Sequence, residues 1–144
     1  MSADAKVHSL RKVVFSYGGY TVDSGRADDG DVIVIEQEND DYGYKVGPDG
    51  DGVFYEQAPG VTTVTLRMMQ TATANAVLSA MASVAKALSG SPAPLAISNA
   101  NGTGKLISAA AVIAKKPDET WAQEPGPYEW KFLVHNPSRL VNSN

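Results

Sequence analysis

The sequence contains no cysteine, only two histidines and no long apolar run. Without cysteine there is neither a disulfide framework nor thiol chemistry. His8 and His135 lie near opposite ends of the chain and no metal-ligand pairing accompanies either, which disfavours a zinc site. The longest apolar run, Ala109 to Ala114, is far too short to span a bilayer, and no basic-then-apolar leader opens the chain. We therefore expect neither a secretory signal nor a membrane partner.

Motifs for catalysis or cofactor binding are also missing. The run Asp49-Gly50-Asp51-Gly52 suggests calcium, but aligning Gly52 with the loop glycine of an EF-hand places Gly47 and Ala58 where acids are required. A hairpin turn explains this run better. Gly102-Thr103-Gly104-Lys105 resembles a fragment of a phosphate loop, yet Leu106 stands where Ser or Thr is needed. We expect no enzyme, no cofactor and no metal.

Charge is divided unevenly along the chain. Eleven acids and two bases lie between Asp23 and Glu56, a net charge of −9, whereas the remainder carries five acids and ten bases, a net charge of +5. The acidic segment is either a solvated surface or one half of a complementary contact between copies. The bases are scattered without interleaved aromatics, which disfavours tight nucleic-acid binding.

One amphipathic helix is predicted in an otherwise β-rich sequence, between Thr71 and Leu88. Thr71, Thr73 and Asn75 offer side-chain caps at its start, and Gly90 is expected to cap its end. Such a helix is expected to cover one face of a sheet. Its apolar stripe, at helical spacing, comprises Ala74, Val77, Leu78, Met81, Val84, Ala85 and Leu88.

Alternating or β-branched runs predict strands on both sides of this helix. The expected strands are Val13–Tyr17, Tyr20–Val22, Val32–Glu38, Tyr44–Val46, Val53–Gln57, Val61–Met69, Leu95–Ser98, Leu106–Ala114 and Glu129–His135. Leu106–Ala114 is almost continuously apolar, so we expect it to be buried on both faces. Val61–Met69 separates an apolar face from a wet face formed by Thr63, Thr65 and Arg67.

These elements predict a mainly β fold: an antiparallel β-sandwich or barrel-like domain with one flanking helix at about residues 71–88. A single domain spanning residues 1–144 is expected, with an arm at residues 1–10 and a short tail at residues 138–144. Residues 117–127 are expected to form an irregular loop that holds Trp121.

A long hairpin is expected at about residues 39–52, where turn signals cluster. It is long for a plain connection. It either reaches a neighbouring copy, with Tyr42 and Tyr44 as anchors, or is an acidic loop in solvent. The candidate assembly residues are Asp40, Asp41, Tyr42, Tyr44, Lys45, Asp49 and Asp51.

The stretch Ala111 to Val134 resembles a C-terminal pattern of the tail tube proteins of contractile-tailed phages. The turn at Gly47 to Gly50, the strand Val61–Met69, the helix start at Asn75 and the strand Val13–Tyr17 are similar to that family as well. The residues that carry the C-terminal likeness are Lys116, Pro117, Trp121, Glu124, Gly126, Glu129 and Trp130.

The resemblance implies a structural virion protein in the phage tail, assembled in the host cytoplasm. Six copies would close into a ring, and stacked rings would form a hollow tube that conducts DNA without specific binding. Sheath, baseplate and tail terminator proteins would be its other partners. Thr63, Thr65 and Arg67 then become candidates for the lumen face, although the same pattern suits the solvent face of a monomer.

Two alternatives are open. One is the tube subunit of a contractile bacteriocin or of a type VI-like secretion apparatus, which the sequence barely separates from a phage tube. The other is a monomeric β-sandwich that binds carbohydrate, for which Trp121 with Tyr128 is the candidate aromatic platform.

Overall fold

The computed structural model describes residues 13–22, 32–58, 60–88, 90–99, 102–119, 121, 123 and 126–141. The expected N-terminal arm at residues 1–10 lies outside them. Among the described residues no helix has the length and apolar character needed to cross a membrane. The elements are β1 (Val13–Tyr17), β2 (Tyr20–Val22), β3 (Ile33–Gln37), β4 (Tyr42–Val46), β5 (Gly52–Glu56), β6 (Thr62–Met68), α1 (Thr73–Ala87), β7 (Ala93–Asn99), β8 (Lys105–Lys115), β9 (Tyr128–His135) and β10 (Ser138–Leu140).

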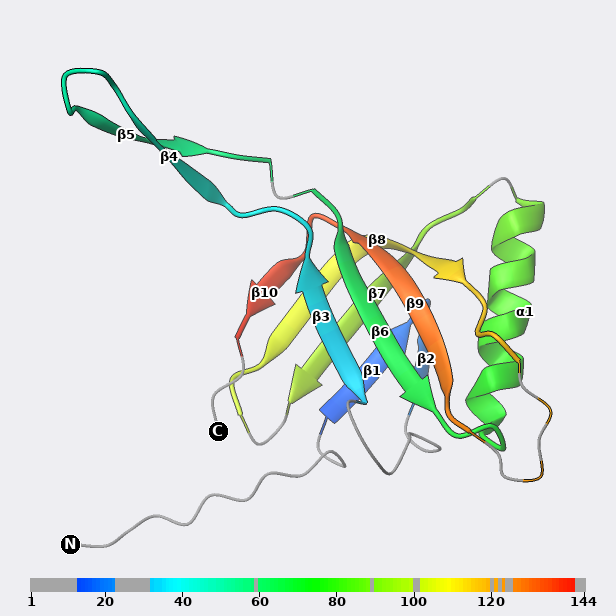
Figure 1. Cartoon of the computed structure of the whole chain (residues 1–144). Coiled ribbons are helices and arrows are strands. Elements are labelled where there is room, and N and C mark those ends of the chain that lie inside the picture. Colours follow the sequence, from blue (N-terminus) through cyan, green and yellow to red (C-terminus); the bar gives the residue numbers. More distant parts are fainter. Residues whose placement is uncertain are drawn as a thin grey trace, which may run out of the picture.

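The strands form one large antiparallel sheet and one separate hairpin. The order in the large sheet is β2-β1-β7-β8-β9-β6-β3, and β10 also pairs with β8. Strands β4 and β5 pair with each other in a sheet of their own. Figure 1 shows this hairpin projecting from one end of the body, while α1 stands beside the large sheet. The prediction of a mainly β, antiparallel fold with one helix is confirmed.

The large sheet folds over on itself into a sandwich-like arrangement. Phe132 on β9 contacts both Phe15 and Tyr17 on β1, with ring centroids 5.3 and 5.1 Å apart. Because β7 and β8 separate β1 from β9 in the sheet order, these contacts require the sheet to curl. The enclosed core also contains the fully buried side chains of Trp130, Leu66, Met68, Leu78, Leu95, Leu106, Val22, Val64 and Val134.

Strand β8 joins the two layers, and its burial corrects one prediction. Its first part pairs with β7 and β10, and its second part pairs with β9. Leu106 and Ala111 are buried, whereas Ile107 between them is 44% exposed. The expectation that this strand is buried on both faces is therefore wrong, because among the described residues no further layer covers its outward face.

The tail expected after Pro137 is also corrected, because Ser138–Leu140 forms β10. Asn136 has φ 42°, in the left-handed region, and there the chain turns out of β9. It then continues along the same edge of β8. At the break between β9 and β10, the buried Ser108 hydroxyl donates to the His135 carbonyl at 2.6 Å.

Helix α1 is capped differently from the prediction at its start and as expected at its end. Ala72 is the N-cap residue and makes no side-chain capping bond. The end agrees with the prediction, because the Gly90 N–H donates to the Ala85 carbonyl at 2.7 Å and Gly90 has φ 84°. The predicted caps Thr71 and Thr73 are exposed.

Only the first half of the predicted apolar stripe is covered. Ala74 and Leu78 are buried, but Val84 and Leu88 are 57% and 65% exposed. Beside the later turns the neighbouring segment is the polar chain after β8. There Lys116 Nζ donates to Ser83 Oγ at 3.0 Å, so the contact beside the exposed end of the stripe is polar.

Asn75 fastens the helix to the sheet instead of capping it. Its Nδ2 donates to the Met69 and Gln70 carbonyls at 2.8 and 3.1 Å. Its Oδ1 accepts a hydrogen bond of 2.9 Å from the indole Nε1 of the buried Trp130. One side chain thus joins the end of β6, the start of α1 and the middle of β9.

We predict that Asn75→Ala lowers the free energy of unfolding by about 1–3 kcal/mol, because it leaves the buried indole N–H and two carbonyls without their partner. Thr73→Ala, on the same turn and exposed, is the matched control and should change it by less than about 0.5 kcal/mol. Urea unfolding followed by tryptophan fluorescence measures both. Equal losses at the two positions would mean that Asn75 acts only as an ordinary helix residue.

Candidate functional site: a projecting hairpin and a polar sheet face

The projecting hairpin consists of β4, β5 and the turn between them. Tyr44 lies opposite Phe54 in its register, and Val46 lies opposite Gly52. In the turn, the Gly50 N–H donates to the Gly47 carbonyl at 3.1 Å and Gly50 has φ 86°, a conformation that favours glycine. A hairpin is present where one was expected, but its bounds differ from the predicted residues 39–52. Strand β4 begins at Tyr42, and the return strand is β5, which extends to Glu56.

Both faces of the hairpin expose apolar side chains. On one face Phe54 is 77% exposed, and on the other Val53 is 60% exposed. An isolated two-stranded hairpin is marginally stable in water, and contiguous exposed apolar surface marks interaction sites. The exposed apolar set is Tyr42, Tyr44, Val46, Val53, Phe54 and Tyr55.

Aromatic rings order the hairpin from within. Tyr44 and Phe54 lie side by side with ring centroids 4.9 Å apart. The ring of Tyr55 occupies the space where a Cβ on Gly43 would stand, and the ring of Tyr44 does the same at Gly52. Aromatic side chains that lie across strand glycines in this way help to fix the pairing register.

Hydrogen bonds at the base of the hairpin fix its direction. Gln37 Nε2 donates to Asp41 Oδ1 at 2.8 Å, and the Gln57 N–H donates to the Asp41 carbonyl at 2.8 Å. The Glu38 N–H donates to the Val61 carbonyl, and the Val61 N–H donates to Glu38 Oε2 at 3.0 Å. The hairpin therefore leaves the body in a defined direction rather than as a free loop.

The seven predicted assembly residues all lie exposed on this hairpin or at its base; they are Asp40, Asp41, Tyr42, Tyr44, Lys45, Asp49 and Asp51. Sequence reasoning missed Val53, Phe54 and Tyr55, because it placed the strand Val53–Gln57 outside the expected hairpin at residues 39–52. The signal was present, because aromatic residues lie symmetrically on either side of the Asp49-Gly50 turn.

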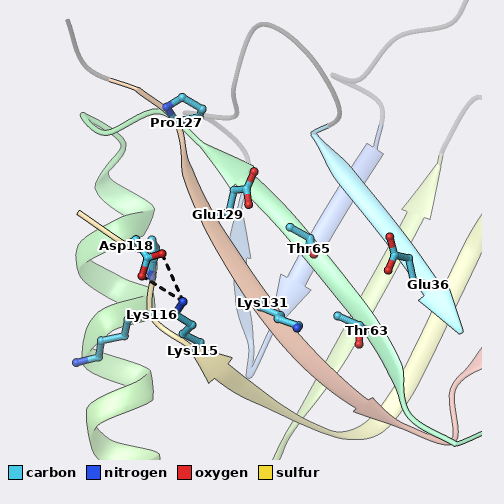
Figure 2. Close-up of a pocket in the computed structure, with 10 residues that line it drawn as sticks. Glu36, Thr63, Thr65, Lys115, Lys116, Asp118, Pro127, Glu129 and Lys131 are labelled. Carbon is cyan, nitrogen blue, oxygen red and sulfur yellow. Dashed lines mark hydrogen bonds and ion pairs between the residues drawn. The ribbon is translucent and has the colours of Figure 1, made fainter. Parts of the chain in front are cut away.

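The second surface is the outward face of β3, β6, β9 and the end of β8, which we call the polar sheet face. Thr63, Thr65 and Arg67 on β6 share this face, because Val64, Leu66 and Met68 between them are buried. Thr65 lies opposite Lys131 on β9, and Thr63 lies opposite Glu36 on β3. Glu36, Thr63, Thr65 and Lys131 line a depression that extends to the chain after β8 (Figure 2). The polar sheet face comprises Glu36, Thr63, Thr65, Arg67, Lys115, Glu129 and Lys131.

The polar sheet face carries charges of both signs. Arg67 Nε lies 3.6 Å from Glu129 Oε1 on the neighbouring strand. Lys115 Nζ lies 3.2 Å from Asp118 Oδ1, just beyond the end of β8. Two of the cations on this face are thus paired with carboxylates, which keeps the local charge close to balanced.

Neither surface has the features of a catalytic centre. Among the described residues no group of three or more His, Cys, Asp or Glu side chains could hold a metal ion. Burial raises the pKa of Tyr17, but this hydroxyl lies in the core and donates to the Ala111 carbonyl at 3.1 Å. What these surfaces offer is contact area and a charge pattern.

We predict that Gly43→Ala or Gly52→Ala displaces the ring that lies over each glycine and loosens the hairpin. The NMR signals of the Tyr44, Phe54 and Tyr55 rings should shift, while those of core residues such as Phe132 stay in place. Gly47→Ala is the control in the same hairpin, because the nearest atom to its added Cβ is 3.6 Å away. Spectra that respond equally at all three glycines would contradict this role for the rings.

The family model of the bacteriophage PhiTE tail tube protein matches residues 11–139. No curated protein matches the sequence significantly. One similar solved structure is from the sheath/tube terminator, in the extended state, of an extracellular contractile injection system called PVC. It has a TM-score of 0.58 and 12% identity over 96% of this chain and 100% of that one.

A second similar structure is the tube terminating cap of the anti-feeding prophage. It has a TM-score of 0.59 and 10% identity over 98% of this chain and 95% of that one. At these identities the two structures bear on the fold alone. This chain shares its mainly β fold with both structures and aligns with each over almost its whole length.

Proposed function

This chain belongs to the bacteriophage PhiTE tail tube protein family, and on that premise we propose that six copies close into a ring and that stacked rings form a DNA-conducting tube. Family membership makes it a structural, non-enzymatic component of a phage tail. The hexamer, the stacking and the passage of DNA are the proposal. The observation that carries it is the ordered hairpin, whose apolar residues are exposed on both faces.

The hairpin is the proposed contact between rings. A head-to-tail stack is a heterologous contact, in which a feature on one end of the subunit fits a different surface on the next. The hairpin projects from one end of the body and therefore suits such a contact (Figure 1). The rings of Tyr42, Tyr44 and Phe54 would supply the buried area, since aromatic residues are enriched at the centres of interfaces.

Charge supports the same contact. Six acids and one lysine lie between Glu38 and Gln57, in and beside the hairpin, whereas most bases lie elsewhere in the chain. An acidic projection that meets a more basic neighbouring surface would orient the subunits as they approach. Asp40, Asp49 and Asp51 are the exposed carboxylates that we assign to this role.

The polar sheet face is the proposed wall of the channel, with Thr63, Thr65 and Arg67 facing the lumen. A conduit should not hold its cargo, because clustered free cations bind the phosphate backbone strongly. Short hydroxyl side chains and paired charges suit a wall along which DNA slides. The proposed partners outside the tube are sheath, baseplate and tail terminator proteins, with assembly in the host cytoplasm.

A second candidate function is a subunit that ends a tube. The two similar structures described above are tube-terminating proteins of contractile injection systems, and this favours the second candidate. A terminator would form a single ring on the end of a tube made of other subunits. A tube subunit would polymerise alone, so the same electron micrographs distinguish the two functions.

We predict that Tyr44→Ser with Phe54→Ser abolishes tube formation and leaves the body folded. The wild-type protein should form hollow rods of uniform width in negative stain, and the variant should form no more than single rings. Val84→Ser, on the helix and 57% exposed, is the control for removing an exposed apolar residue and should still form rods. Rods from the double variant would exclude the hairpin as the contact between rings.

A further inference from the structure

We infer that Glu129 and Asp118 serve to mask the cations of the polar sheet face, so that this face does not retain a phosphate polyanion. The inference rests on the proposed function only in taking this face as the channel wall. The masking itself is a property of the folded chain and can be measured in any state of assembly.

The geometry places each carboxylate beside one cation. Glu129 Oε1 lies 3.6 Å from Arg67 Nε across adjacent strands, and Arg67 and Glu129 are directly opposite in the register. Asp118 reaches Lys115 Nζ with Oδ1 at 3.2 Å and with Oδ2 at 3.4 Å. Both ion pairs lie on or beside the same depression, as the dashed lines in Figure 2 show for Lys115 and Asp118.

Two like charges lie next to each other on this face. Lys115 and Lys131 are direct cross-strand partners, an arrangement in which two ammonium groups repel each other. Within the described residues, Lys131 has no ion-pair partner, so Asp118 on Lys115 and Glu129 on Arg67 reduce the positive charge around it. Lys116 is directed away from this group by its bond to Ser83 on the helix.

Without the two carboxylates, the polar sheet face would carry three cations, Arg67, Lys115 and Lys131, against the single carboxylate of Glu36. Such a cluster, beside the hydroxyls of Thr63 and Thr65, has the donors that bind phosphate. If that cluster were repeated around a ring, the channel wall would bind DNA instead of letting it slide past. The carboxylates therefore determine which cargo the face tolerates, although they contribute little to folding, since exposed ion pairs are weak.

The test uses the full chain and a fluorescein-labelled DNA duplex, with binding followed by fluorescence anisotropy at low salt. The wild-type protein should not bind measurably, and Glu129→Gln with Asp118→Asn should bind. The logarithm of its affinity should fall against the logarithm of salt with a slope of about −2 to −3, as expected for two or three neutralised phosphates. Adding Lys131→Ala should reduce that slope by about one.

The matched control is Asp49→Asn with Asp51→Asn, which removes the same charge at the tip of the hairpin and should leave DNA unbound. Equal binding by both double variants would mean that net charge alone acts, and would overturn the masking. No binding by Glu129→Gln with Asp118→Asn, or no effect of Lys131→Ala, would overturn it as well. Electron micrographs of the wild-type protein test the tube separately. If the wild-type protein forms rods but Glu129→Gln with Asp118→Asn does not bind DNA, only the masking is rejected. If that variant binds DNA but the wild-type protein forms no rods, only the proposed conduit is rejected.

Discussion

The contact of Phe132 with Phe15 and Tyr17 is the interaction on which the rest of the structure depends. It brings β9 onto β1 and closes a single long sheet into two layers around a dry core. Once those faces are turned inward, the alternation of each strand turns the other set of side chains outward. The polar sheet face is therefore a consequence of core formation. Its charged side chains point away from the core and take no part in core packing.

The hairpin lies outside this constraint. It shares no sheet with the body, and its apolar side chains exceed what a two-stranded unit can bury by itself. Its internal order comes from rings that lie over Gly43 and Gly52, and its direction comes from hydrogen bonds at Asp41 and Glu38. An element that is ordered, directed and yet exposed is well suited to contact another copy, where its apolar surface would be removed from water.

The sequence predicted most strands because alternation is a local signal. The boundaries of β1 and β2 agree with the prediction, and the buried and wet faces of β6 were assigned correctly. Long-range partners were beyond this kind of reasoning. Asn75 was expected to cap the helix, but its partner Trp130 is 55 residues away, and the pairing of Arg67 with Glu129 depends on strand order. Likewise, the alternation of Val53–Gln57 could not tell which sheet the strand joins, so Phe54 and Tyr55 were missed.

Cryo-electron microscopy of the particles that the purified chain forms tests the central claim most directly. Stacked rings should be seen, with the Tyr44 and Phe54 rings buried against a subunit of the adjacent ring and with Thr63, Thr65 and Arg67 facing a central channel. A particle that stays a single chain at high concentration, or a tube in which the hairpin remains in solvent, would contradict the account.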